Sequence, residues 1–156
     1  MKGFFDVVES REGYIDQYGM QHNSKKVKLT AAQILLLHTT PQTLITSPGP
    51  DKFILIDNAV AYLDYSGGAF AGSNDLEIRA VDGSGTLLVE DGFASGFLNG
   101  VADAIAVEAG VAYWGEVTRV LDQAVVAVVP VADPTGALST STLSIILNYT
   151  IIKVHN

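Results

Sequence analysis

The sequence has no cysteine, few charged residues and no long apolar run. The absence of cysteine excludes disulfides and thiolate metal sites. No apolar run approaches the roughly 20 residues that a membrane helix needs. Asp6 and Glu9 interrupt the N-terminus before the apolar region of a signal peptide could form. We therefore expect a soluble protein that is made in the cytoplasm and does not bind a membrane.

Basic residues are scarce: Lys and Arg number 9 against 17 Asp and Glu, giving a formal net charge of −8. This balance argues against nucleic-acid binding, which needs cations to neutralise phosphates. Residues 1–30 hold five basic and four acidic groups, so an almost neutral N-terminal segment precedes an acidic body. Because 48% of the residues are hydrophobic and only 17% charged, we expect either an uncharged polar surface or an apolar surface that a partner covers.

Motifs of catalysis and of metal binding are missing. The three histidines, His22, His38 and His155, lack ligand spacing, and no serine lies in a G-x-S-x-G elbow. No glycine-rich stretch has the spacing of a phosphate-binding loop. Asp57 and Asp64 fall on opposite faces of a predicted strand, which disfavours a shared site. We predict no catalytic, cofactor-binding or metal-binding residues, and hence no enzyme.

One short helix is predicted over about residues 30–38. Thr30 followed by Gln33 forms a capping box, in which the two side chains bind free backbone N–H groups at a helix start. Pro41 disfavours helix in the residue before it, so the helix should end near His38. A histidine at a helix end suits the free carbonyls there, and we interpret it as structural.

The rest of the chain has the pattern of strands separated by Gly, Pro, Asp and Ser turns. The strand over 52–65 has apolar residues on both faces, so it is either largely buried or changes face partway. We predict an all-β fold, a jelly-roll or related β-sandwich of about eight strands. The expected strands cover residues 4–8, 42–46, 52–65, 75–81, 86–90, 104–109, 124–132 and 141–154.

An extended N-terminal arm is predicted over residues 1–26, followed by a single β-sandwich or jelly-roll domain over 27–156. Aromatic side chains on such an arm need a surface to cover. Trp114, beside Tyr113, is better explained as an interface or core anchor than as a sugar platform, since no other aromatics cluster there. The predicted interface residues are Phe4, Phe5, Tyr14, Tyr18, Tyr113 and Trp114.

Three segments carry a family resemblance: "KLTAAQILLLHTTPQTLITSPGPDKFILIDNAVAYLDY", then "NDLEIRAVDGSG", and the terminal "STLSIILNYTII". In this order they resemble small tailed-phage and prophage virion proteins of jelly-roll type, most like capsid decoration (cement) proteins. The similarity covers about residues 27–154, and the first 26 residues fall outside it.

The resemblance implies a structural virion protein that binds and stabilises the head shell, as a homotrimer. Its partners would be the major capsid protein and its own copies, without nucleic acid or membrane. It would lie on the capsid surface after synthesis in the host cytoplasm, and no catalytic residues or cofactors come with the family. A tail, neck or fibre adaptor, or a receptor-binding module with a carbohydrate site near Trp114, remains an alternative. A hydrolase with an unrecognised site is a third possibility.

Overall fold

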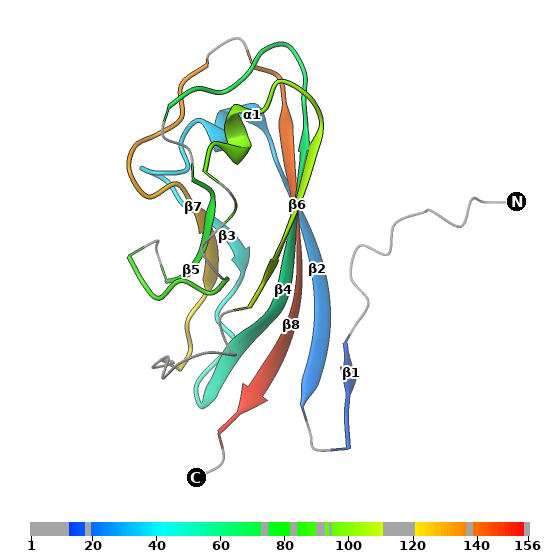
Figure 1. Ribbon diagram of the computed structural model, residues 1–156. Coiled ribbons are helices and arrows are strands. Elements are labelled where there is room, and N and C mark those ends of the chain that lie inside the picture. The colour runs from blue at the N-terminus through cyan, green and yellow to red at the C-terminus, as the bar shows by residue number, and fades with distance from the viewer. Residues whose placement is uncertain are drawn as a thin grey trace, which may run out of the picture.

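Two antiparallel sheets pack face to face in the computed structural model (Figure 1). The model describes residues 13–17, 20–72, 75–81, 84–89, 93, 95–110, 121–136 and 139–154. The five-stranded sheet has the order β1 (Tyr14–Ile15), β2 (Gln21–Leu29), β8 (Thr142–Lys153), β4 (Lys52–Asp64), β6 (Ala104–Ala109). The three-stranded sheet has the order β3 (Gln42–Ile45), β7 (Val125–Val128), β5 (Glu77–Ala80). The short helix α1 (Ala31–Ile34) and a 3-10 turn (Phe97–Asn99) complete the described elements. The predicted all-β sandwich with one short helix is confirmed.

The core lies between the sheets and is closed at one end by α1, as Figure 1 shows. Phe70 and Phe93 are its largest fully buried side chains, and Ile34 and Leu37 extend it beneath the helical segment. Burying one such side chain contributes about 1.5–3 kcal/mol. β7 is buried along its whole length, which agrees with the continuous apolar run in its sequence.

The central strand β4 contains a β-bulge between Ile56 and Asn58. Before the bulge Ile54 and Ile56 point into the core, and after it Ala59 and Leu63 do. One extra residue shifts the two-residue alternation of a strand by one position, so the buried face changes parity without the strand leaving the sheet. This explains the apolar residues on both faces, and the second of the two predicted alternatives is confirmed.

The capping box at Thr30 is present, but the α-helix is shorter than predicted. Thr30 N donates to Gln33 Oε1 at 2.9 Å, and Gln33 N donates to Thr30 Oγ1 at 3.4 Å. The helix ends at Ile34 rather than near residue 38. The backbone N–H groups of Leu36 and Leu37 bind the carbonyl three residues back instead of four, which tightens the chain into turns.

His38 joins this turn segment to the end of β7. Its ring Nδ1 lies 2.9 Å from the carbonyl oxygen of Val129. Asp133 accepts hydrogen bonds from the backbone N–H groups of His38 and Thr39 at 2.8 and 3.0 Å, and from the Thr39 hydroxyl at 2.8 Å. These contacts agree with the structural interpretation of His38.

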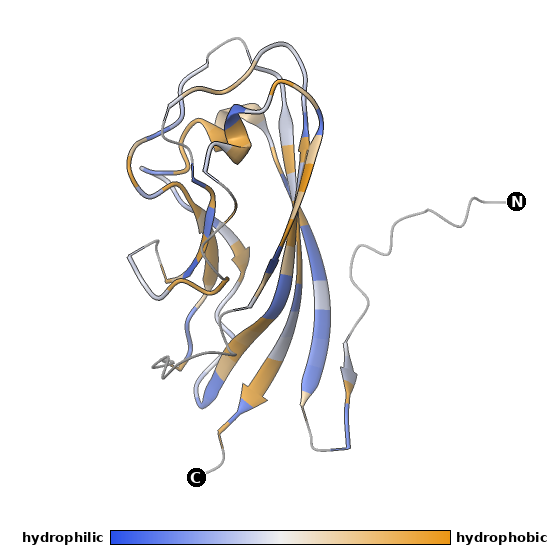
Figure 2. Ribbon diagram, in the orientation of Figure 1, coloured by the Kyte–Doolittle hydropathy of each residue, from blue (hydrophilic) through white to orange (hydrophobic). Residues whose placement is uncertain are grey.

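Two further differences from the predicted strands have a physical cause. β2 begins at Gln21, inside the segment predicted as an arm, and pairs with β8 over its whole length. It gives little strand signal because residues 21–26 are polar on both faces of the strand (Figure 2). The strand predicted over 86–90 is wrong for its described part, residues 86–89, which make only isolated bridges at Leu87 and Val89. The strand predicted over 4–8 lies outside the described residues.

No helix among the described residues is long and apolar enough to cross a membrane.

Acid should release the turn that Asp133 holds. Desolvation acts to raise the pKa of Asp133, but the hydrogen bonds from Thr39 and His38 outweigh it and hold the pKa below its ordinary value of 3.8. A lowered folded-state pKa stabilises the fold above 3.8, and this contribution is lost as pH falls through the folded-state pKa. Amide-exchange protection of His38 and Thr39 should therefore fall below pH 3.8, while Leu37, held by a backbone carbonyl, should keep its protection. Unchanged protection of all three amides down to about pH 2 would contradict this assignment.

Candidate functional site

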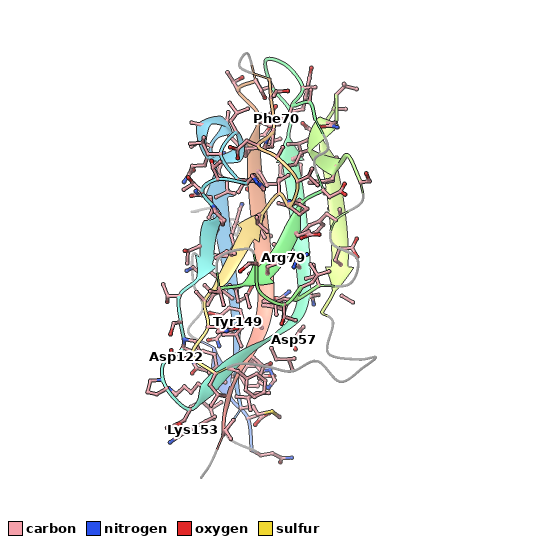
Figure 3. All side chains as sticks on the ribbon, turned by 90° about the vertical axis from the view of Figure 1, so that its left-hand side faces the viewer. Asp57, Phe70, Arg79, Asp122, Tyr149 and Lys153 are labelled. Atoms are coloured by element: carbon pink, nitrogen blue, oxygen red, sulfur yellow. The ribbon has the colours of Figure 1, made fainter. Side chains whose placement is uncertain are left out.

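A pocket of about 480 Å³ opens where the β1–β2 hairpin lies beside β8 and β4. We call it the hairpin pocket. Its volume falls within the roughly 300–1,000 Å³ typical of small-molecule sites. Figure 3 places Asp57, one of its lining residues, in the lower part of β4 near the level of Tyr149. The lining residues are Gly13, Tyr14, His22, Asn23, Ser24, Asp57 and Asn148.

The bulge in β4 supplies the floor of the pocket. It turns two consecutive polar residues, Asp57 and Asn58, toward the outer face of the five-stranded sheet. There the Thr150 hydroxyl donates to Asp57 Oδ2 at 3.1 Å, and Asn148 Nδ2 donates to Asn58 Oδ1 at 2.8 Å. Gly110 N donates to the carbonyl oxygen of Asp57 at 3.0 Å and closes the bulge from the β6 side. Both polar side chains are therefore anchored to the neighbouring strand β8.

A chain of hydrogen bonds continues from the bulge to the hairpin. His22 Nδ1 lies 3.1 Å from Thr150 Oγ1, and its Nε2 lies 3.0 Å from Asp16 Oδ2. The other oxygen of Asp16 accepts from the backbone N–H of Met20 at 3.0 Å. We call the series Asp16–His22–Thr150–Asp57 the polar clasp.

The polar clasp has the acid–His–hydroxyl order of a catalytic triad, but it lacks the access that a nucleophile needs. Thr150 is only 3% exposed, and its hydroxyl hydrogen is directed to Asp57 rather than to the imidazole. A substrate carbonyl could not reach Oγ1. The clasp therefore attaches the hairpin to the sandwich and does not provide a nucleophile.

Tyr14 is the one predicted interface residue that the structure describes. It lies in β1, is 67% exposed, and stacks on the His22 ring with centroids 4.9 Å apart and an interplanar angle of 23°. Gly13 allows this close approach, because a Cβ there would come within 1.6 Å of the His22 carbonyl oxygen. Outside the described residues lie the other predicted interface side chains: Phe4, Phe5, Tyr18, Tyr113 and Trp114.

Sequence reasoning missed the pocket because it assumed regular alternation between Asp57 and Asp64, although a change of face was one of its alternatives for this strand. Asp57 and Asp64 were expected on opposite faces, but the bulge places both toward solvent. They still form no common site, because Asp64 contacts Thr142 and Asp57 contacts Thr150, and seven residues of strand span roughly 23 Å. The both-face apolar pattern around Asp57 was the signal that could have revealed the bulge.

Above the pocket the same outer face is apolar. Register places Val60 beside Val107, and Tyr62 beside Ile105. Ile105 is 69% and Val107 64% exposed, although β6 is an edge strand. Desolvation, with the nearby Asp103 and Asp64 carboxylates, raises the pKa of Tyr62. We define the outer patch as Val60, Tyr62, Ile105, Val107 and Ile146.

No group of three or more His, Cys, Asp or Glu side chains that could hold a metal ion occurs in the part of the chain that the structure describes.

Removing the Thr150 hydroxyl should destabilise the protein more than the same change at Thr142. Thr150→Val removes the buried hydroxyl that Asp57 and His22 share, which should cost about 0.5–1.5 kcal/mol of unfolding free energy, the net value of a typical hydrogen bond. Thr142→Val removes a longer, exposed contact to Asp64 on the same strand and should cost less than about 0.5 kcal/mol. Urea unfolding of the two variants checks this. Equal losses would show that the polar clasp does not hold the hairpin.

No protein-family model matches this chain, and no curated protein does. Among solved structures the chain is similar to one described as "Capsid of Ralstonia phage GP4", with 16% sequence identity, 87% of this chain and 86% of that chain covered, and a TM-score of 0.42. These values are too low to place the chain in a family or to assign it a function.

Proposed function

We propose that this protein is a structural component of a phage virion, a decoration protein that binds and stabilises the head shell. The observation that carries the proposal is the outer patch. It is a contiguous set of apolar side chains on a sheet face that nothing covers among the described residues. A protein that works by contact with other proteins needs such a face.

The position of the outer patch suits an extended protein interface. Ile105 and Val107 project from β6, whose second edge carries no strand in the described part of the sheet. An edge strand with free backbone N–H and C=O groups and apolar side chains can pair with another chain. On the other side of the face, Lys26 and Lys28 of β2 are exposed. The outer face of the five-stranded sheet therefore carries apolar side chains on the β6 side and basic side chains on the β2 side.

The resemblance of residues 27–154 to capsid decoration proteins supports the identity of the partners in this proposal. They are the major capsid protein and two further copies of this chain in a homotrimer on the capsid surface. The predicted arm aromatics, of which Tyr14 is exposed beside the sheet, would add contacts to a neighbouring subunit. The role is non-enzymatic, which agrees with the burial of the Thr150 hydroxyl away from any substrate.

A second candidate is a tail, neck or fibre adaptor, or a module that binds a carbohydrate receptor. The hairpin pocket favours it, because the pocket is open and has hydrogen-bonding side chains in its lining beside the exposed Tyr14.

Purified protein mixed with undecorated phage shells should bind them and raise their melting temperature. Val107→Lys places a charge in the outer patch and should weaken binding at least about tenfold, equivalent to 1.4 kcal/mol. Val131→Lys is the matched control, because Val131 is equally exposed at 64% but lies outside the patch. Co-sedimentation and scanning calorimetry of the shells give the two readouts, and analytical ultracentrifugation gives the oligomeric state.

Absence of shell binding by the unmodified protein would overturn the decoration role. Binding by Val107→Lys as tight as that of Val131→Lys would overturn the role of the outer patch, and a monomer at shell-binding concentrations would overturn the trimer.

A further inference from the structure

We infer that the hairpin pocket is a binding site for a neutral saccharide, recognised through adjacent hydroxyl groups. The inference deepens the second candidate function and does not depend on shell decoration, because the pocket and the outer patch use different side chains.

The pocket presents hydrogen-bonding groups that have no partner among the residues that the structure describes. Asp57 uses Oδ2 to accept from Thr150, which leaves Oδ1 as an acceptor. Asn148 uses one amide hydrogen on Asn58, which leaves its second amide hydrogen and its oxygen. Ser24, in register with Asn148, is exposed and adds a hydroxyl. One carboxylate, one amide and one hydroxyl thus lie together on three adjacent strands.

This set matches the chemistry of a sugar. Each sugar hydroxyl both donates and accepts a hydrogen bond. A carboxylate oxygen accepts from a hydroxyl, and an amide donates to one oxygen while accepting from another. Asp57 and Asn148 are held side by side, since Asn148 pairs with the residue that follows Asp57. They can therefore contact two neighbouring hydroxyl groups of one ring.

Tyr14 supplies the apolar wall that a pyranose requires. One side of its ring stacks on His22, and the side chain is nevertheless 67% exposed. An aromatic ring offers a flat apolar surface to the C–H groups of a sugar ring while its hydroxyl stays in water. Polar groups on the floor and an aromatic ring at the side are the arrangement of a small-molecule site with defined orientation.

Charge and rigidity narrow the ligand class. Among the residues that the structure describes, the pocket lining includes no Lys or Arg, both ring nitrogens of His22 are engaged within the clasp, and Asp57 would repel an anionic sugar. A neutral saccharide is therefore favoured. The bulge and the polar clasp hold the recognition groups in place before a ligand arrives, which lowers the entropic cost of binding.

A glycan array followed by calorimetric titration of the full chain with the retained neutral saccharides tests the inference. The unmodified protein should retain at least one neutral glycan. Asn148→Ala and Tyr14→Ala should each weaken binding about tenfold or more, equivalent to 1.4 kcal/mol. Tyr62→Ala, which removes an aromatic ring from the outer patch, should bind as the unmodified protein does. Unfolding curves of every variant establish that each is folded.

Three results would overturn the inference: no neutral glycan retained by the folded protein, equal retention by all variants, or loss of binding in Trp114→Ala with Asn148→Ala unaffected. The last result would place a sugar site elsewhere on the chain. The outcome is separable from that of the shell experiment, because Asn148→Ala should still bind shells and Val107→Lys should still bind the glycan.

Discussion

The extra residue at the bulge of β4 is the constraint on which the rest of the structure depends. β4 lies between β8 and β6 in the larger sheet, and its two halves bury opposite parities of the sequence. Without the extra residue, Ile54 and Ala59 could not both face the core, because successive side chains of a strand alternate. The bulge resolves this conflict while keeping the register with β8 on both sides.

Both candidate functional surfaces follow from the same shift. At the bulge, Asp57 turns outward, engages Thr150, and through His22 connects the hairpin to the sheet. After the bulge, the residues that point outward are Val60 and Tyr62, which lie beside the exposed side chains of β6. The hairpin pocket and the outer patch therefore share one backbone feature. Protein contact and ligand recognition can be carried by different parts of one sheet face.

The strands with strong periodicity were predictable, and the features built by contacts between distant residues were not. β8 alternates and β7 is continuously apolar, so each follows from its own sequence. β2 is polar and is a strand only because β8 provides its hydrogen-bond partners. The helix cap at Thr30 could be predicted from the sequence, but the early end of the helix could not. The hairpin pocket depends on a bulge that a local pattern showed only as apolar residues on both parities around Asp57.

Single-residue deletions in β4 and β8 test the role of the bulge most directly. Deleting Asp57 removes the extra residue and restores regular alternation, so the account predicts a folded protein with cooperative urea unfolding, reduced stability and no pocket. Deleting Ile146 from β8, which pairs with β2 without a bulge, leaves no extra residue to absorb the shift and turns the buried side chains on one side of the deletion away from the core, so the account predicts loss of cooperative folding. Far-UV circular dichroism through a urea titration distinguishes the two. Equal loss of folding in both deletions, or a folded Ile146 deletion, would contradict the account.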